Sequence, residues 1–586
     1  MLKENISPEQ INADKTKEQK NDDPEIRRFV FNALIKENGD KLTVHTKHLG
    51  NIEDIYRKIS RAQKEQAAVP AGALAIIDAF ANCRKEFELD GGKKITRAPR
   101  LLIAGGFVRD VLLGKLPKDI DFATNFTAAE VKELLNGKLN NIKKMETQGE
   151  CFQVVRVILE RAEQANGDGA REEYEIATFR EDSPESDGRR PLRVKPAKYA
   201  GKDAERRDLT VNALFYNTES GNVIDYVGGL DDIKNKKLRF VGDPGKRIAE
   251  DKLRLLRYAR FLLKTGFTAG KKDREAVRSH ASDINAIAKE RIKDELEKML
   301  QTFTADDVLK TLDNLDLLKA TIPEVKALEN CEQGPPYHLK GNVLKHTLTV
   351  GSNLPKDANL KLKWAAIFHD IAKPETREEK IINGKTKVSF LKHDELGAEK
   401  IKPILRRLNF SVKEINDIAW LILNHQFFFN KICGRIKRAG ELNPDATAKA
   451  WQKSIGEIKN MIIDRGEDLV GDLAKLAVAD NQATQSEPGL TEGDGKIITE
   501  AFNKTLQKIT KEKEKGIDLK KLANGNDVME IFQIKAGKKV GEILKIFNAM
   551  LLEDAALEDI KDADEARLYA LKKLKESAGE ILNQLT

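Results

Sequence analysis

Residues 104–124 of the chain read AGGFVRDVLLGKLPKDIDFAT and contain a double glycine, an Arg-Asp pair and two aspartates separated by one residue. The pattern of DIDFAT predicts a strand, in which side chains two residues apart point to the same face. Asp119 and Asp121 would then present both carboxylates to one point, while Ile120 and Phe122 face the core. Two carboxylates this close repel each other. The arrangement costs least when a divalent cation lies between them, and Mg²⁺ is typically held by one or two carboxylates and by substrate phosphate oxygens.

The glycines upstream of this pair predict a phosphate-binding turn. Gly105 and Gly106 follow the apolar strand LLIA, and they allow backbone N–H groups to come close to a phosphate. The helix FVRDVLLG would begin there and direct its positive N-terminal end to the same place. Arg109 would add a guanidinium group that can bind a triphosphate. Together these elements predict a site for metal-dependent nucleotidyl transfer.

The sequence around this stretch predicts an α+β protein. Apolar residues at helical spacing over residues 52–87 predict a helical segment before the motif. Strands that alternate with helices over residues 100–240 predict an N-terminal α/β head with a small mixed sheet. From residue 248 to about residue 480 nearly everything reads as amphipathic helix, so we expect an all-α region after the head.

Composition restricts the class of protein only weakly. The chain has 586 residues, and 102 Lys and Arg against 94 Asp and Glu give a net charge of +8, which is weak support for a polyanionic partner. The four cysteines form no C-x-x-C pair, which argues against a disulfide framework or a zinc ribbon and fits the cytoplasm. No apolar run approaches the roughly 18 residues that a membrane span needs, so we expect no membrane partner.

Several further motifs follow in order, and together they carry a resemblance to a known family. The segments GGFVRDVLLG, DIDFAT, YEIATFR, RRDLTVNALFYN, DYVGGLDDIKNKKLRFVG and AEDKLRLLRYARF resemble the ordered motifs of class II tRNA nucleotidyltransferases and bacterial poly(A) polymerases, in the polymerase β superfamily. The resemblance runs from about Leu101 to Phe261. It implies that Asp119 and Asp121 hold the metals that activate the RNA 3′-hydroxyl and bind the triphosphate, with Glu175 as a further candidate ligand. It also implies a motif that reads the sugar and orients phosphates, made of Arg206, Arg207, Asp208 and Asn212.

The stretch EDKLR, residues 250–254, predicts how the base is chosen. On a helix, Asp251 and Arg254 would share a face. An Asp accepts a hydrogen bond from an exocyclic amine and an Arg donates one to a ring nitrogen, a pattern that cytosine and adenine present and that uracil and guanine invert. The resembled family is thought to select CTP and ATP in this way. Arg257, one turn further on, would hold phosphates or position Asp251; a plain ion pair on a solvated helix is the alternative.

A second candidate metal site lies in the helical region. Five of the eight histidines lie between His338 and His425. The order H…HD…D resembles the HD phosphohydrolase domain, whose metal activates water against a phosphate ester. The candidate ligands of this second divalent metal, which could be Mg²⁺, Mn²⁺ or Ni²⁺, are His346, His369, Asp370 and Asp480, with His393 and His425 at the positions where related domains hold a second ion.

The expected organisation has seven parts: a leader (1–28), a helical segment (29–96), the nucleotidyltransferase head (97–241), a helical neck with the nucleotide-selecting motif (242–325), an HD-like domain (326–483), a linker (484–500) and a helical RNA-binding tail (501–586). In the tail, the segment IKAGKKVGEIL at residues 534–544 suits a nucleic-acid phosphate or a helix-turn-helix packing element.

The leading hypothesis is a cytoplasmic CCA-adding enzyme that uses CTP, ATP and Mg²⁺ to complete the tRNA 3′ end, with the helical body and tail holding the acceptor arm. An A-adding or CC-adding enzyme, or a poly(A) polymerase, would use the same site. Gln153 stands where the family has a glycine, and DGRRP lies in a loop that could govern the change from C to A, so nucleotide specificity stays open, as does the oligomeric state.

Two functions of other classes are disfavoured. An HD phosphohydrolase with a degenerate transferase lobe, or a catalytically silent RNA-binding protein, would not need the residues that are intact here: Asp119, Asp121, Asp251 and Arg254.

Overall fold

The computed structural model describes residues 30–37, 40–63, 67–83, 85–89, 93–97, 99–148, 153–160, 171–183, 186–188, 193–336, 341–382, 384–484, 486, 491, 493–552, 554–558 and 560–585. The predicted leader, 1–28, lies outside these residues, as does most of the loop that contains DGRRP. The chain divides into two units, Met1–Ile287 and Ala288–Thr586, each with its own elements and core. The expected α+β class is confirmed, with strands of the head followed by helices.

A nine-stranded mixed sheet organises the first unit. Its order is β1-β2-β13-β12-β5-β6-β9-β8-β7, and only β6 and β9 run parallel to each other. The strands are β1 (Val30–Glu37), β2 (Asp40–His48), β13 (Asn222–Asp225), β12 (Leu214–Asn217), β5 (Leu101–Ala104), β6 (Asp121–Thr124), β9 (Arg171–Thr178), β8 (Val154–Glu160) and β7 (Ile142–Gln148). The sheet is therefore mixed, as expected, but it is not small.

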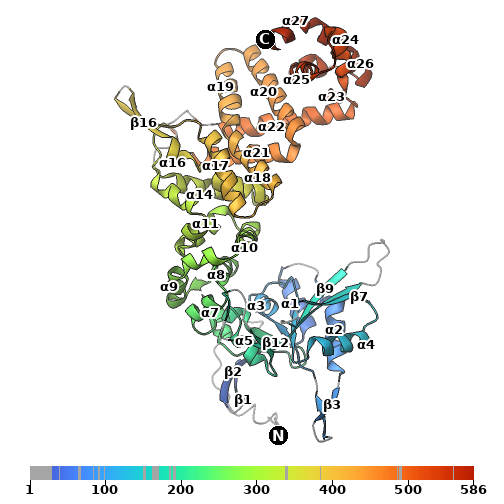
Figure 1. Ribbon diagram of the computed structural model, residues 1–586, viewed down its shortest axis with the longest axis vertical. Helices are drawn as coiled ribbons and strands as arrows, with labels where there is room; N and C mark the ends of the chain where they lie inside the picture. The colour runs from blue at the N-terminus through green and yellow to red at the C-terminus, as the bar shows by residue number, and fades with distance from the viewer. Residues whose placement is uncertain are drawn as a thin grey trace. The chain divides into compact units, whose positions relative to one another are not determined.

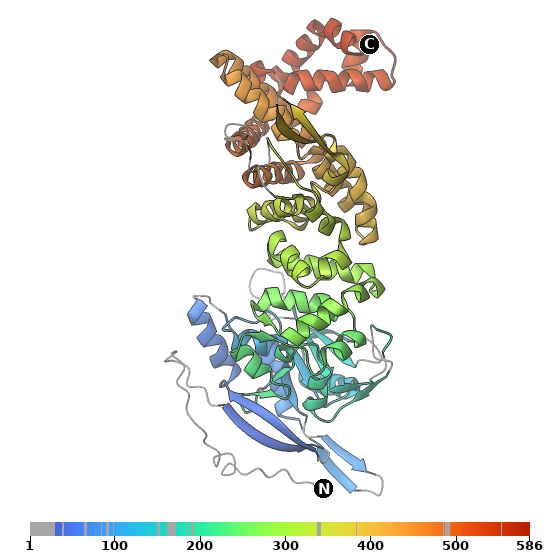
Figure 2. The same ribbon diagram turned by 90° about the vertical axis from the view of Figure 1, so that its left-hand side faces the viewer.

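The expectation that residues 29–96 are helical is wrong in part. Helices α1 (Ile52–Gln63) and α2 (Ala71–Ala81) are present, but the antiparallel hairpin β1–β2 precedes them and adds two strands to the sheet beside β13 (Figure 2). A second hairpin, β3 (Lys85–Leu89) and β4 (Lys93–Arg97), follows. Helical spacing of apolar residues predicts only the helices of this region, whereas the Asn-Gly dipeptide between the two β-rich runs of residues 30–48 is a strong hairpin signal.

Both faces of the central strands are buried, by two different groups of side chains. Leu101 and Ile103 of β5 pack into a large cluster with α1, α2, α3 (Gly106–Leu112) and α4 (Ala128–Lys138), whereas Leu102 and Ala104 pack into a smaller one that includes residues of α5 (Ala200–Glu205). Because successive side chains of a strand point to opposite faces of the sheet, every second residue faces the same cluster.

Short elements after the sheet complete the first unit. They are β10 (Arg180–Asp182), β11 (Val194–Pro196), the 3₁₀ turn η1 (Thr210–Asn212), α6 (Gly229–Lys234), β14 (Lys237–Leu238), α7 (Pro244–Glu250), α8 (Arg254–Thr265), β15 (Thr268–Ala269), α9 (Lys271–Ser279) and η2 (Ala281–Ala286). The expected strand LRFVG is thus only two residues long, and it pairs in parallel with β15.

The second unit is helical except for one hairpin, among the residues described. Its helices are α10 (Lys289–Thr302), α11 (Ala305–Asn314), α12 (Leu317–Thr321), α13 (Pro323–Lys326), η3 (Ala327–Asn330), α14 (Val343–Asn353), α15 (Leu360–Phe368), α16 (Lys373–Thr376), α17 (His393–Arg407), α18 (Val412–Asn424), the π-helix η4 (Phe428–Cys433), α19 (Gly434–Gly440), α20 (Pro444–Arg465), α21 (Glu467–Ala483), α22 (Asp494–Glu514), α23 (Leu519–Leu522), α24 (Gly525–Phe532), α25 (Lys538–Leu552), η5 (Ala555–Glu558), α26 (Ala563–Glu576) and α27 (Ala578–Leu585).

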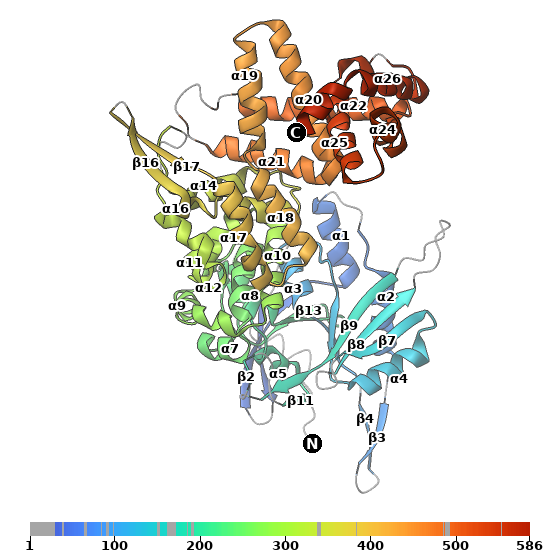
Figure 3. The same cartoon turned by 45° about the horizontal axis from the view of Figure 1, so that its top comes forward.

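Two expectations for this unit are corrected. The hairpin β16 (Arg377–Ile382) and β17 (Lys385–Phe390) interrupts the region expected to be helical and projects from the helices around it (Figures 1 and 3). The expected linker 484–500 is too long, because α22 already begins at Asp494. Helices α23–α27 share a core of their own around Phe547 and Val528. Among the described residues, no helix is both long and apolar enough to cross a membrane.

Candidate active site and metal centre

Three carboxylates lie together where β6 and β9 run side by side. Asp121 is the first residue of β6, and the parallel register places Glu175 of β9 directly beside it. Asp119 and Asp121 are exposed while Ile120 and Phe122 are buried, so the expected alternation of burial is confirmed. The strand itself is shorter than expected, because β6 begins at Asp121 and leaves Asp119 just before it. The strand positions of Asp121 and Glu175 put both on the face of the smaller core cluster, opposite the face covered by α1–α4.

The electrostatics of this acidic group favour a cation. Although Asp121 is exposed as a residue, surrounding protein atoms shield its carboxyl group from part of the solvent, and this burial is the main cause that raises its pKa to about 6. The negative charges of Glu175 and Asp119 raise the pKa further, while Arg207 lowers it. Three carboxylates in mutual repulsion are the oxygen donors that a hard divalent cation prefers. The residues present therefore fit a divalent metal of the Mg²⁺ type, and Glu175, a lesser candidate from sequence, is brought to the site by the strand register.

Gly105 has a steric reason to be glycine. Its φ is +68°, and a Cβ there would lie 3.0 Å from the guanidinium of Arg207 and 3.3 Å from the carbonyl oxygen of Asn212. Its N–H donates to the carbonyl of Leu214 at 2.9 Å, which ties the start of α3 to β12. Gly106 is the first residue of α3, one residue before the expected start of that helix. The glycines thus bring the helix start against the Arg207 and Asn212 motif.

Arg109 is placed differently from the expectation. Its side chain is only 3% exposed, and its guanidinium donates to the Asn212 side chain at 2.6 Å and to Asp110 at 2.8 Å. The guanidinium also lies over the ring of Phe261, 5.1 Å from its centre. These partners hold the guanidinium of Arg109 inside the fold. Arg109 therefore contacts Asn212 of the motif formed by residues 206–212, and its guanidinium is not exposed to solvent as a direct phosphate ligand would be.

Each residue of the RRD motif, residues 206–208, makes an ion pair with a neighbouring element. Asp208 accepts hydrogen bonds from Arg257 at 2.6 and 2.9 Å, and from Asn212 at 3.1 Å. Burial raises the pKa of Asp208, but the charge of Arg257 and these hydrogen bonds outweigh it and lower the pKa to about 2. Arg206 and Arg207 both pair with Asp203, at 2.5 and 2.9 Å.

Asp203 was missed by sequence reasoning. Its side chain is buried, and its position three and four residues before the two arginines, on α5, is the sequence signal that could have found it. Arg257, which was expected to hold phosphates or to position Asp251, is anchored on the carboxylate of Asp208.

The nucleotide-selecting stretch does not form one helix, so the expected helical face for Asp251 and Arg254 is wrong. Helix α7 ends at Glu250 and α8 begins at Arg254. The Asp251 side chain accepts the N–H of Leu253 at 3.1 Å, and such local side-chain bonds to the backbone compete with helix continuation. Asp251 therefore lies in the turn between the two helices, and we call residues 250–254, the turn with the helix residue on each side of it, the selector turn.

The guanidinium of Arg254 is clamped on three acceptors. It donates to the Glu250 carboxylate at 2.6 Å, to the Arg247 carbonyl at 2.8 Å and to the Arg206 carbonyl at 2.9 Å. Glu250 in turn pairs with Arg247 at 2.9 Å. Glu250 lies inside the stretch EDKLR but had no role in the sequence prediction. The structure links Arg254 to the RRD motif through Arg206.

The loop between β10 and β11 contacts the selector turn. Ser186 Oγ donates to the Glu250 carbonyl at 2.6 Å, and the Lys252 N–H donates to the Gly188 carbonyl at 3.1 Å. Gln153, at the start of β8, has φ +49°, a value that favours glycine, and this agrees with the departure noted from the sequence.

Six buried side chains converge in the second unit at the expected second metal site. They form two groups in which ligand atoms lie within 4.8 Å of one another: His346, His369 and Asp480 in one, and Asp370, His393 and His425 in the other. The ligands come from α14, α17 and α21 and from the C-terminal ends of α15 and α18. All the candidate ligands predicted from the HD resemblance are thus brought together.

Backbone carbonyls fix the orientation of three of the imidazoles. The Nδ1 atoms of His369, His393 and His425 lie 2.9, 2.7 and 2.6 Å from carbonyl oxygens, which can only accept. Each Nδ1 therefore carries the proton, and each Nε2 faces the centre, as in metal-binding histidines. The Nε2 atoms pair at 3.3 Å (His346 with His369) and 3.0 Å (His393 with His425).

Asp370 connects the two groups. Its Oδ2 lies 3.1 Å from the His369 Nε2 and its Oδ1 lies 3.4 Å from the His393 Nε2. Lys373, not singled out from the sequence, lies 2.7 Å from the same carboxylate. Burial and then the neighbouring histidines lower the pKa of His425 to about 4, which keeps its imidazole neutral. Although burial opposes both shifts, the charge of Asp370 raises the pKa of His369, while the neighbouring histidine and lysine hold the pKa of Asp370 itself well below its usual range. Imidazole nitrogens and ionised carboxylates around one centre fit divalent metal binding, which displaces any proton on those nitrogens.

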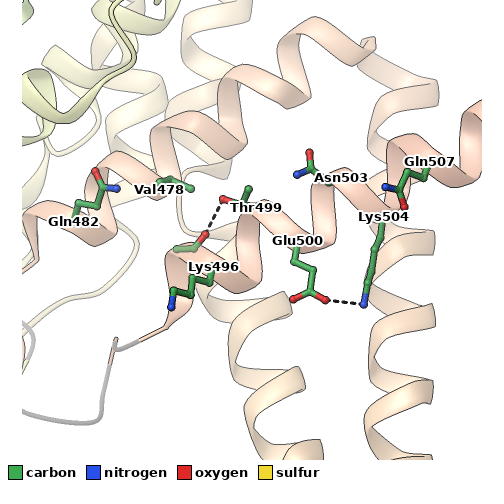
Figure 4. Close-up of a pocket in the computed structure, with 9 residues that line it drawn as sticks. Val478, Gln482, Lys496, Thr499, Glu500, Asn503, Lys504 and Gln507 are labelled. Atoms are coloured by element: carbon green, nitrogen blue, oxygen red, sulfur yellow. Dashed lines mark hydrogen bonds and ion pairs between the residues drawn. The ribbon is translucent and has the colours of Figure 1, made fainter.

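A separate groove of about 610 Å³ is lined by residues of α21 and α22. Figure 4 shows its lining, in which Lys504 pairs with Glu500 at 2.8 Å and the amides of Asn503 and Gln507 stand on the same helix. Lys504 also covers the ring of Trp451 at 4.0 Å. The groove contains none of the six candidate metal ligands.

Three family models match the chain. Residues 101–239 match the Poly A polymerase head domain, residues 266–328 match the probable RNA and SrmB-binding site of polymerase A, and residues 342–462 match the HD domain. The acidic group and the RRD motif lie in the first match. The selector turn lies outside all three.

Known proteins align over most of the chain. The A-adding tRNA nucleotidyltransferase of Deinococcus radiodurans is 30% identical over 385 residues, 64% of this chain and 80% of that protein. The CC-adding tRNA nucleotidyltransferase of Thermus thermophilus is 28% identical over 479 residues, 80% of this chain and 92% of that protein. The crystal structure of the Bacillus stearothermophilus CCA-adding enzyme in complex with CTP has a TM-score of 0.55 at 20% identity and covers 87% of this chain and 98% of that one, which shows a shared fold.

Proposed function

Since the chain belongs to the class II tRNA nucleotidyltransferase and poly(A) polymerase family, we propose that it adds C, C and A to the 3′ end of tRNA from CTP and ATP. The observation that carries this proposal is the acidic group of Asp119, Asp121 and Glu175 beside the RRD motif of the same unit. Its substrate tRNA would be met in the cytoplasm.

Each residue of the site has a proposed role. Asp119 and Asp121, with Glu175 beside them, would hold Mg²⁺, which when bound polarises the RNA 3′-hydroxyl and offsets charge on the phosphates. That hydroxyl attacks the α-phosphorus in line, so one P–O bond forms to the RNA and one breaks to release pyrophosphate. Arg206 and Arg207 would orient the phosphates and sugar, with Asp208, Arg257, Asn212 and Arg109 fixing the geometry behind them.

Base choice would rest on the selector turn. Asp251 would accept the exocyclic amine of cytosine or adenine, and Arg254 would donate to the ring nitrogen. The clamp by Glu250 and two carbonyls leaves Arg254 with little rotational freedom, which favours a fixed hydrogen-bond pattern. A second candidate, addition of A alone to a tRNA that ends in CC, is favoured by the alignment with the A-adding relative. The helical unit and tail would hold the acceptor arm, mostly through backbone and shape.

One assay separates these activities. A tRNA transcript without its last three nucleotides, a transcript that ends in CC and a generic RNA are offered labelled CTP and ATP, singly and together. The expected result is ordered addition of C, C and A to the first transcript, followed by a stop. Addition of A only to the transcript ending in CC would assign the A-adding activity, and an A tail on every RNA would assign a poly(A) polymerase.

A second function is favoured by the six-ligand centre of the second unit. We propose that it binds Mg²⁺, Mn²⁺ or Ni²⁺ and hydrolyses phosphate esters at RNA or nucleotide ends. When bound, the metal would polarise water for attack on phosphorus. His346, His369 and Asp480 would hold one ion and His393 and His425 another, with Asp370 between them, and Lys373 would fix the Asp370 carboxylate.

The Asp370→Asn substitution tests this centre. We expect bound metal per chain to fall and hydrolysis of a 2′,3′-cyclic phosphate at an RNA end to drop roughly 100-fold, because a shared ligand loses its charge. Metal content is measured by atomic absorption after dialysis, and nucleotide addition should not change. Glu395→Gln, an exposed carboxylate on α17 near His393, is the control. Equal metal content in Asp370→Asn and the parent chain would contradict the assignment.

A further inference from the structure

The hairpin β16–β17 is unlike the rest of the second unit. It projects from the helices (Figures 1 and 3), and among the described residues its two strands pair only with each other. Every residue of β16 is exposed, including Ile381 at 78% and Ile382 at 48%. An isolated two-stranded hairpin is marginally stable in water, so this arm is retained at a cost in stability.

The base of the hairpin is joined to the metal centre. The N–H of Val388 donates to the Pro335 carbonyl at 2.9 Å, and its side chain packs so closely on Gly334 that a Cβ there would lie 2.4 Å from it. The carbonyl of Phe390, the last residue of β17, accepts the Nδ1–H of the ligand His393 at 2.7 Å. The arm is thus anchored at one end and leads directly into the first residue of α17.

One face of the hairpin carries an excess of positive charge. The register sets Lys380 opposite Lys387 and Ile382 opposite Lys385, so the three lysines share a face. Glu378, on the same face, pairs with Lys380 at 2.9 Å, while Lys385 and Lys387 make no ion pair with any described residue. Like charges directly opposite each other destabilise a strand pair, and a bound anion between them would remove that penalty. On the other face, Arg377 and Glu379 neutralise each other at 2.9 Å.

We propose that this lysine face, made of Lys380, Lys385 and Lys387, binds the phosphate backbone of RNA and brings the bound RNA toward the six-ligand centre. The charge of the face calls for a polyanion, and the exposed Ile382 beside the lysines offers apolar contact to a sugar or base. The choice of RNA among polyanions rests on the proposed function. The sequence predicts only that the helical body and tail hold the acceptor arm, and the hairpin assigns this contact to named residues of the body.

The Lys380→Glu substitution tests the proposal. It removes the ion pair with Glu378 but sets a carboxylate opposite Lys387, so the hairpin exchanges one ion pair for a favourable cross-strand pair. Circular dichroism and the melting temperature of the variant check that the fold is kept. For the full chain and a tRNA transcript without its last three nucleotides, we expect about tenfold weaker binding at low salt and a salt slope reduced by about one. Lys413→Glu, at an exposed lysine on α18, is the matched control and should change neither by more than twofold.

The outcomes separate this proposal from the proposed function. If Lys380→Glu binds the transcript with the affinity and salt slope of the parent chain while the parent chain adds C, C and A, the arm does not bind RNA. If the parent chain adds no nucleotide but Lys380→Glu weakens tRNA binding, the proposal that the hairpin binds RNA is supported and the transferase proposal fails. A change of oligomeric state in Lys380→Glu, measured by sedimentation without RNA and with tRNA binding unchanged, would show that the face contacts a second copy of the chain and overturn the proposal.

Discussion

Replacement of Asp121 by Asn is expected to lower the rate of nucleotide addition by about three orders of magnitude, equivalent to ~4 kcal/mol of transition-state stabilisation. The substitution keeps the size of the side chain but removes the charge that would hold the metal beside Glu175 and Asp119. The pKa of this carboxyl is raised to about 6, which means that the site already favours the neutral form of the side chain. The fold should therefore tolerate the neutral side chain of Asn. Single-turnover addition of CMP to the truncated tRNA measures the effect.

Two controls make this result specific. Asp231→Asn, an exposed aspartate on α6, should add CMP at the parental rate. Glu175→Gln should show a smaller loss of rate than Asp121→Asn, and raising the Mg²⁺ concentration should recover part of the loss, because both aspartates proposed to hold the metal, Asp119 and Asp121, remain. Parental activity in Asp121→Asn would refute the metal assignment, whereas an equal loss in Asp231→Asn would point to misfolding.

The acidic group was predictable because its signal is local. The alternation in DIDFAT fixes which side chains share a face, and the structure confirms that Ile120 and Phe122 are buried while Asp119 and Asp121 are not. The order of the histidines also predicted the metal centre. What places Glu175 beside Asp121, however, is the parallel register of β6 and β9, strands separated in the chain by two others. Pairing between distant segments leaves no local pattern to read.

The errors have identifiable physical causes. The prediction of a single helix through EDKLR counted the helical spacing of apolar residues but not the tendency of Asp251 to bond its own backbone, which ends α7. Arg109 was assigned to phosphate because of its charge, but its burial among Asn212, Asp110 and Phe261 depends on tertiary packing. The hairpin β16–β17 was missed because a short charged strand pair at the surface has little apolar alternation.

Arg254 carries the second large effect that we expect. A hydrogen-bond donor fixed in space can discriminate a ring acceptor from a ring N–H, and one such contact is worth about 1–3 kcal/mol by analogy with base readout. The hydrogen bonds from Arg254 to Glu250 and to the carbonyls of Arg247 and Arg206 hold its guanidinium in place. Removing the side chain also leaves those two carbonyls without this donor, so some loss of stability should accompany the change.

Arg254→Ala is therefore expected to narrow the preference for CTP over UTP by roughly 10- to 100-fold, because 1.4 kcal/mol corresponds to a factor of ten. The measurement is the ratio of kcat/KM for CTP and UTP on the same enzyme preparation. A ratio is independent of the fraction of folded enzyme, so the expected loss of stability cannot imitate the effect. Arg274→Ala, an exposed arginine on α9, should keep the parental ratio. If Arg254→Ala lowers both rates equally and keeps the ratio, Arg254 supports the fold or the phosphates, and base choice must reside in Asp251 or elsewhere.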